Sequence, residues 1–110
     1  MDNTEVVNNT SKYIVKTTGI GSETNQELVD AEKLAEGTDG SKVSLIECYY
    51  LLEGTGTLTI STGSEDLTLT GKGKYGLRPN QLKYGNDKII KLTTDSNVKS
   101  YLLVTEFRRN

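Results

Sequence analysis

The sequence contains no histidine among its 110 residues. Imidazole is the usual base beside a serine or cysteine nucleophile, so its absence excludes Ser-His-Asp and Cys-His catalytic sites. Histidine is also a frequent ligand of zinc, iron and manganese, and its absence disfavours metal-dependent catalysis. We therefore predict no metal site, no cofactor and no catalytic residue. Whether the protein is an enzyme stays open, and the absence of imidazole favours a protein that is not one.

Cysteine is almost absent as well. Cys48 is the single cysteine of the chain, so neither an intrachain disulfide nor a cysteine-based zinc site can form. It lies in an apolar stretch and has no histidine to activate it. We interpret Cys48 as a small buried side chain rather than a nucleophile.

Long hydrophobic runs are missing too. No apolar run approaches the roughly 20 residues that span a bilayer. The first residues are acidic and polar, whereas a signal peptide begins with basic residues followed by apolar ones. We expect a soluble protein of a reducing compartment, either cytoplasmic or part of an assembled virion, that is neither secreted by a signal peptide nor held in a membrane.

The composition favours short strands. Hydrophobic residues make up only 34% of the chain, and threonine, serine, asparagine and glycine are abundant. The length suits a single domain. Residues 1–11 have only Val6 and Val7 as sizeable apolar groups, so we expect an N-terminal arm there and one β domain over residues 12–110.

Residues 43–52 carry the clearest strand pattern. Apolar residues occupy both faces of this stretch, which is typical of a central strand. Further apolar segments follow at intervals of about 10 residues, the spacing of a sandwich or barrel. One predicted face of the strand contains Val43, Leu45, Glu47, Tyr49 and Leu51, and the other contains Ser44, Ile46, Cys48, Tyr50 and Leu52.

Residues 24–36 allow two interpretations. Thr24 and Glu27 have the spacing of a helix capping box, and Gly37 stands where a helix would end. Leu28, Ala31, Leu34 and Ala35 would share one helical face. These local signals favour one short helix. The alternative is a strand with Val29, Ala31 and Ala35 on one face.

Charge is distributed unevenly along the chain, although the net charge is only −2. Residues 1–70 contain twelve acidic residues and four lysines, a net charge of −8, whereas residues 71–110 contain nine basic and three acidic residues, a net charge of +6. The two parts attract each other either within one domain or between subunits. We expect a homo-oligomer or a larger protein assembly.

Two stretches together resemble the cupin family over about residues 40–104. The first runs from Glu47 through Gly54 and Gly56, which matches the strand and glycine turn of the first cupin motif. The second contains, in order, Gly71, Leu77, Pro79 and Asn86. The resemblance implies an all-β fold, a small single-domain jelly roll or cupin-like β-barrel.

The metal ligands of the family are largely missing from the matching positions. Glu47 stands at the position of the metal-binding glutamate, but Ser41 and Val43 replace the two histidines before it, and Lys83 replaces the later one. A buried carboxylate needs a partner, and we expect Glu47 to pair with Lys83 inside the barrel. Alternatively, these residues bind a small polar ligand, or Glu47 faces solvent. The candidate pocket contains Glu47, Tyr49, Tyr75 and Lys83.

Basic residues gather late in the sequence. Their candidate roles are binding of a phosphate, a nucleic acid or an acidic protein face, or simply a solvated surface. Because the isoelectric point is near 5.1, nucleic acid is disfavoured and an acidic patch on a neighbouring subunit is the better partner. This candidate interaction surface contains Lys72, Lys74, Arg78, Lys88 and Lys91.

Two classes of function are therefore predicted. The first is a non-catalytic structural or interaction module that acts through its surface and N-terminal arm in an oligomeric assembly, such as a virion decoration or connector component. The second is a metal-free cupin that binds a small polar molecule in its barrel. A metal-free sugar epimerase or isomerase is a less favoured form of the second class, because such enzymes generally use a histidine base.

Overall fold

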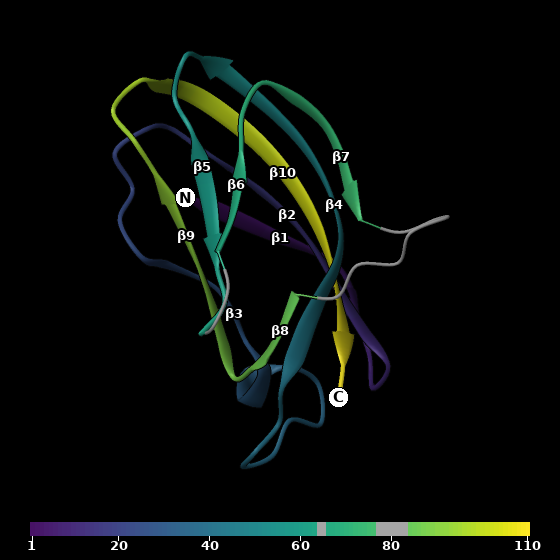
Figure 1. The fold of residues 1–110 in the computed structure, drawn as a ribbon. Coiled ribbons are helices and arrows are strands. Elements are labelled where there is room, and N and C mark those ends of the chain that lie inside the picture. Colours follow the sequence, from purple (N-terminus) through teal and green to yellow (C-terminus); the bar gives the residue numbers. More distant parts are fainter. Residues whose placement is uncertain (64–65, 77–83) are drawn as a thin grey trace.

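The computed structural model describes residues 1–63, 66–76 and 84–110, with the side chains of residues 84 and 85 excepted. Within these residues ten strands form two antiparallel sheets that face each other (Figure 1). The all-β jelly roll predicted from the sequence is thereby confirmed. The described residues contain no helix that is long and apolar enough to cross a membrane.

The larger sheet has six strands. Its continuous path runs β1-β2-β10-β4-β7, and β8 pairs with the same edge of β4 as β7 does, nearer the start of β4. The long strands β4 and β10 form its centre. The strands of this sheet are β1 (Asp2–Asn8), β2 (Lys12–Gly19), β10 (Val98–Arg109), β4 (Val43–Gly54) and, along the same edge of β4, β7 (Lys72–Gly76) and β8 (Tyr84–Asp87).

The smaller sheet has four strands, in the order β3-β9-β5-β6. In β5, β6 and β9 alternate side chains are buried against the larger sheet, as expected of strands with one wet face. The strands are β3 (Gln26–Asp30), β9 (Ile89–Thr94), β5 (Leu58–Ser61) and β6 (Asp66–Leu69).

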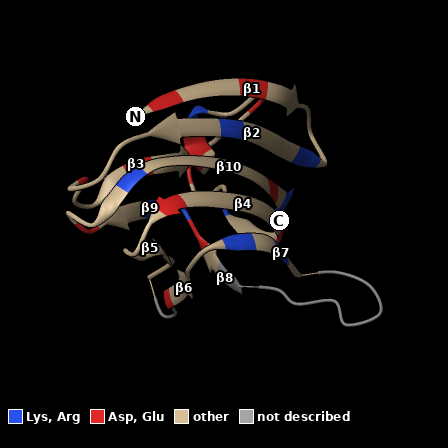
Figure 2. Ribbon diagram, turned by 90° about the horizontal axis from the view of Figure 1, so that it is seen from above, with Lys and Arg blue, Asp and Glu red and all other residues tan. Residues whose placement is uncertain are grey.

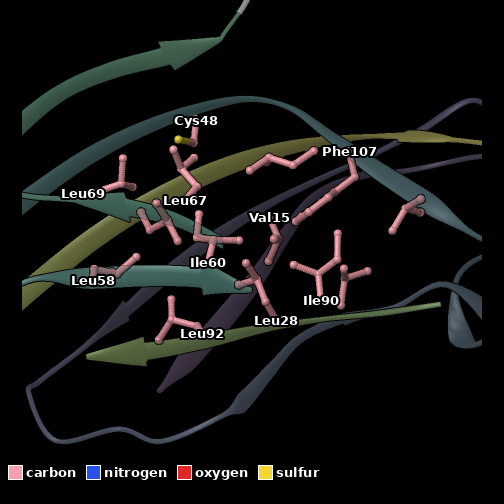
Figure 3. Packing of buried hydrophobic residues seen from close by; sticks show 14 of the residues in the cluster. Val15, Leu28, Cys48, Leu58, Ile60, Leu67, Leu69, Ile90, Leu92 and Phe107 are labelled. Carbon is pink, nitrogen blue, oxygen red and sulfur yellow. The ribbon is translucent and has the colours of Figure 1, made fainter. Parts of the chain in front are cut away.

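Apolar side chains from both sheets fill the space between them (Figure 3). Phe107 and Val15 of the larger sheet are fully buried, as are Ile60 and Leu92 of the smaller one. Cys48 belongs to this core. Burial of this surface is the main stabilising contribution to the fold.

A β-bulge at Ile46 divides strand β4 into two parts. Glu106 lies opposite Glu47 and Phe107 opposite Leu45, so Ile46 is an extra residue on β4. Val43, Leu45, Cys48 and Leu52 point into the core, whereas Tyr49 and Leu51 are exposed. The prediction of one uninterrupted alternation from Val43 to Leu51 is therefore wrong, because the bulge transfers the second half of the pattern to the other face.

Residues 24–36 form no α-helix. Their first part is strand β3, which buries Leu28 and Val29 and pairs with β9. One 3₁₀ turn follows, η1 (Ala31–Lys33), and the side chain of Asp30 accepts a hydrogen bond from the backbone N–H of Glu32 at its start. The helix favoured by the local signals is a wrong prediction, because pairing with β9 and burial in the core outweigh capping and propensity.

Most of the segment expected to form an N-terminal arm lies in strand β1. It pairs with β2 of the same chain, with a bulge at Val6, and its other edge is the free edge of the larger sheet. Thr17 on β2 donates a hydrogen bond to the side-chain oxygen of Asn3 at 2.7 Å. In the single chain, residues 2–8 are therefore part of the larger sheet.

Candidate functional site

The surface of the larger sheet that points away from the smaller sheet, which we call the outer face, brings together several of the predicted functional residues. On β2 and β10, residues such as Val15 and Leu103 point into the core, and the residues between them point outward. The outer face comprises Ile14 and Lys16 of β2, Leu102, Val104 and Glu106 of β10, Glu47, Tyr49 and Leu51 of β4, and Lys72 and Lys74 of β7.

Strand register arranges the outer face in rows. Tyr49 lies at its centre, opposite Val104 on one side and Lys74 on the other. The next row joins Glu47 to Glu106. The row on the other side of Tyr49 joins Leu102, Leu51 and Lys72. Figure 2 shows blue segments on β2 and β7, the strands on either side of β10 and β4.

The middle of the outer face is apolar and open to solvent. Tyr49 is 49% exposed and Leu51 is 44% exposed, although both lie on a central strand. Neighbouring aliphatic residues Ile14, Leu102 and Val104 are partly exposed. Single apolar side chains are common on protein surfaces, but a contiguous group of this kind is typical of an interaction site.

Two carboxylates and one lysine lie beside this apolar centre. Lys74 Nζ is 3.0 Å from the Glu47 carboxylate and 5.2 Å from the centre of the Tyr49 ring. The hydrogen bond from Lys74 to Glu47 raises the pKa of the lysine, and its hydrogen bond to Tyr49 raises it to a smaller extent. Glu106 lies directly opposite Glu47 and forms no salt bridge within the described residues.

A shallow hollow of about 210 Å³ opens between these side chains. Glu47 and Glu106 provide its charged part, and Tyr49, Ile14 and Val104 provide its walls. A hollow with this lining suits a positively charged group on an aliphatic stem, because the methylenes contact the apolar walls while the charge meets carboxylate.

The predicted pocket is divided between the two faces of the sheet. Glu47 and Tyr49 lie together on the outer face, whereas Tyr75 packs against the core from the inner face. Lys83 lies outside the described residues, and so does its predicted pairing with Glu47. The lysine that the structure places beside Glu47 is Lys74. The bulge explains why Glu47 faces outward rather than into the barrel.

The predicted basic surface is also divided. Lys72 and Lys74 lie on β7, at the border of the outer face. Lys88 forms a salt bridge of 3.2 Å with Glu32, and Lys91 lies on β9 of the smaller sheet. Arg78 falls outside the described residues. The described lysines therefore belong to separate surfaces.

Sequence reasoning missed Ile14, Val104 and Glu106. A signal for two of them is present, since Leu102, Val104 and Glu106 alternate with the buried residues of β10. Apolar residues occur in both phases of that strand, and the pattern alone does not show which phase faces outward.

A second hollow of about 160 Å³ lies near β1, β2 and β3, and its lining includes Glu5, Glu27 and Asp30. Lys33 occupies the acidic side, with Nζ 3.9 Å from the carboxylates of both Glu27 and Asp30. Within the described residues, no three histidine, cysteine, aspartate or glutamate side chains are grouped closely enough to hold a metal ion.

Comparison with known proteins yields a similarity of fold. No protein-family model matches the chain, and no curated protein matches its sequence. The structure is similar to the crystal structure of a cupin domain from Bordetella pertussis Tohama I, with 13% sequence identity and a TM-score of 0.43, over 99% of this chain and 92% of that one. This similarity concerns the fold alone.

Proposed function

We propose that the protein is a non-catalytic interaction module that acts through the outer face of its larger sheet in an oligomeric assembly. The observation that carries this proposal is the exposure of Tyr49 and Leu51 on the central strand β4. When one face of a central strand carries apolar residues, that face is usually covered by other parts of the protein or by a partner. In the single chain this apolar group lies open.

The core does not need these residues, because the space between the two sheets is filled by other apolar side chains. An aromatic residue surrounded by aliphatic ones, with lysines and glutamates around them, is the composition of a protein interface. A partner that covers Tyr49 and Leu51 would remove their apolar surface from water. This transfer is favourable by about 25 cal/mol for each Å² of apolar surface buried.

The polar and reactive side chains of strand β4, in the core and on the outer face, do not favour catalysis. Burial raises the pKa of the Cys48 thiol to about 11, which makes it a poor nucleophile at neutral pH. Glu47 and Lys74 form a salt bridge on the surface, so this carboxylate already has a partner within the chain. Both observations support binding rather than chemistry.

Binding of a small polar molecule is a second candidate, favoured by the hollow beside Glu47 and Tyr49. Its volume of about 210 Å³ lies below the roughly 300–1,000 Å³ typical of ligand pockets. The interaction module is therefore the better supported function. A role as a virion decoration or connector component stays a prediction.

The mass of the native assembly tests the proposal. We expect light scattering during gel filtration to give a mass well above the 12.1 kDa of one chain. Leu51→Lys places a charge in the apolar centre and should shift the protein to a monomer. Ile20→Lys is the matched control, because Ile20 is also apolar and 67% exposed but lies beyond Gly19, the last residue of β2 that pairs with β10.

A monomeric mass at every concentration, with no effect of Leu51→Lys, would overturn the proposal. The second candidate has its own test, in which a panel of metabolites is screened for a rise in melting temperature. A compound that stabilises the native protein but not Glu47→Gln would favour ligand binding.

A further inference from the structure

The charges of the outer face are of both signs. Lys74 and Glu47 neutralise each other within the chain. Lys16 and Lys72, which are both exposed, remain as positive groups, and Glu106 remains as a negative one, without a salt bridge in the part of the chain that is described. A partner of a single charge would meet repulsion somewhere on this surface, whereas a second copy offers both signs.

Glu106 is poorly compensated in the single chain. It is half-buried, it faces the hollow between Ile14 and Val104, and its opposite neighbour across β4 is another carboxylate. Like charges directly opposite each other destabilise a sheet. A lysine ammonium group that enters the hollow would relieve this repulsion and would place its methylenes against the apolar walls.

The positions of Lys72 and Glu106 are related through Tyr49. From Tyr49, Glu106 is one strand away on β10 and one row toward Glu47, and Lys72 is one strand away on β7 and one row toward Leu51. Tyr49 is thus the midpoint between them. The two residues lie on opposite sides of the centre and form no salt bridge within one chain.

These two positions are exchanged by a twofold axis that runs parallel to the outer face, passes over Tyr49 and is perpendicular to the line from Lys72 to Glu106. When two outer faces meet around such an axis, Lys72 of each copy lies over Glu106 of the other. The same operation places Leu51 of one copy near Val104 of the other, and Tyr49 against its own symmetry mate. Apolar groups then meet apolar groups and charges meet opposite charges, as a self-complementary twofold interface requires.

We propose that the partner on the outer face is a second copy of this chain, and that Lys72 of each copy binds the Glu106 carboxylate of the other. This inference rests on the function proposed above and adds the identity of the partner and the ion pair that sets the relative orientation of the two copies. Each dimer contains the pair twice because of its symmetry.

Charge exchange tests the pairing. Lys72→Glu and Glu106→Lys each create two repulsive contacts per homodimer, and we expect each to raise the dimer Kd at least about tenfold in sedimentation velocity. A mixture of the two variants should form heterodimers with a Kd near that of the wild type, because both contacts again join opposite charges. Lys91→Glu, on the smaller sheet, is the matched control.

Restored binding in the mixture also excludes a salt bridge between positions 72 and 106 of the same chain, because each variant chain carries like charges at these two positions. Circular dichroism of each variant checks folding, and Lys72 on the border strand is the safer of the two sites to change. If Leu51→Lys dissociates the assembly while the two charge variants neither weaken it nor restore each other, the inferred pairing is wrong and the proposed function stands. A wild-type protein that stays monomeric overturns both.

Discussion

Glu47 and Glu106 lie directly opposite each other on β4 and β10, with the bulge at Ile46 next to them. Two carboxylates in such a position repel each other. Lys74 offsets part of this repulsion through its 3.0 Å contact with Glu47. The hydrogen bond from Lys74 to Glu47 holds the pKa of the lysine above its usual value of 10.5.

Removal of Lys74 should therefore lower stability in a way that depends on pH. A lysine whose pKa is higher in the folded state stabilises the protein fully below its unfolded value, and this contribution disappears as the pH rises through the folded value. We expect Lys74→Gln to melt at a lower temperature than the wild type at pH 8, and the difference to vanish well above pH 10.5. A difference that does not change with pH would contradict the role of the charge.

Two buried threonines should respond in opposite ways to the same substitution. Thr105 is fully buried and its hydroxyl has no hydrogen-bond partner in the described part of the chain, whereas the hydroxyl of Thr17 is bonded to Asn3. Thr105→Val should raise the free energy of unfolding by about 1 kcal/mol, because a buried polar group without a partner is removed. Thr17→Val should lower it by about the same amount. Urea denaturation measures both, and destabilisation by Thr105→Val would contradict the assignment.

Gly76 should be less replaceable than Gly71, although both have positive φ, +96° and +69°. A Cβ atom on Gly76 would collide with the carbonyl oxygen of Ile46 at the bulge, whereas one on Gly71 would meet no atom within 4 Å. We expect Gly71→Ala to cost roughly 1 kcal/mol through backbone strain alone and Gly76→Ala to cost clearly more. Equal losses in thermal denaturation would show that the close approach of Gly76 to Ile46 is not needed.

Cys48 should resist thiol reagents in the folded protein. It is fully buried, and burial raises its pKa to about 11, so that little thiolate exists at pH 8. We expect Ellman's reagent to label Cys48 only after unfolding in guanidinium chloride. Rapid labelling of the native protein would show that the core around Cys48 opens readily.

Much of the fold follows from local pattern. The apolar stretch from Val43 to Leu52 was predicted to be a central strand. It forms β4, which pairs with β10 along one edge and with β7 and β8 along the other. The later apolar segments are strands as well. These predictions hold because a run of β-prone residues bounded by polar turns has few other ways to bury its side chains.

The candidate site was less accessible from the sequence. Glu47 and Tyr49 were identified, but their face was not, because one extra residue at Ile46 reverses the orientation of every side chain after it. The alternation along β10 did not single out Glu106, since its importance lies in its position opposite Glu47. Such a relationship exists only when the two strands are paired.

The sequence by itself determined that the chain contains no histidine and therefore no imidazole base or ligand. It also determined the all-β class, because composition and alternation are local properties. The tertiary structure alone decided that residues 26–30 are a strand and that Glu47 faces outward. Both outcomes depend on long-range pairing, of β3 with β9 and of β4 with β10, whose energy outweighs the local preferences.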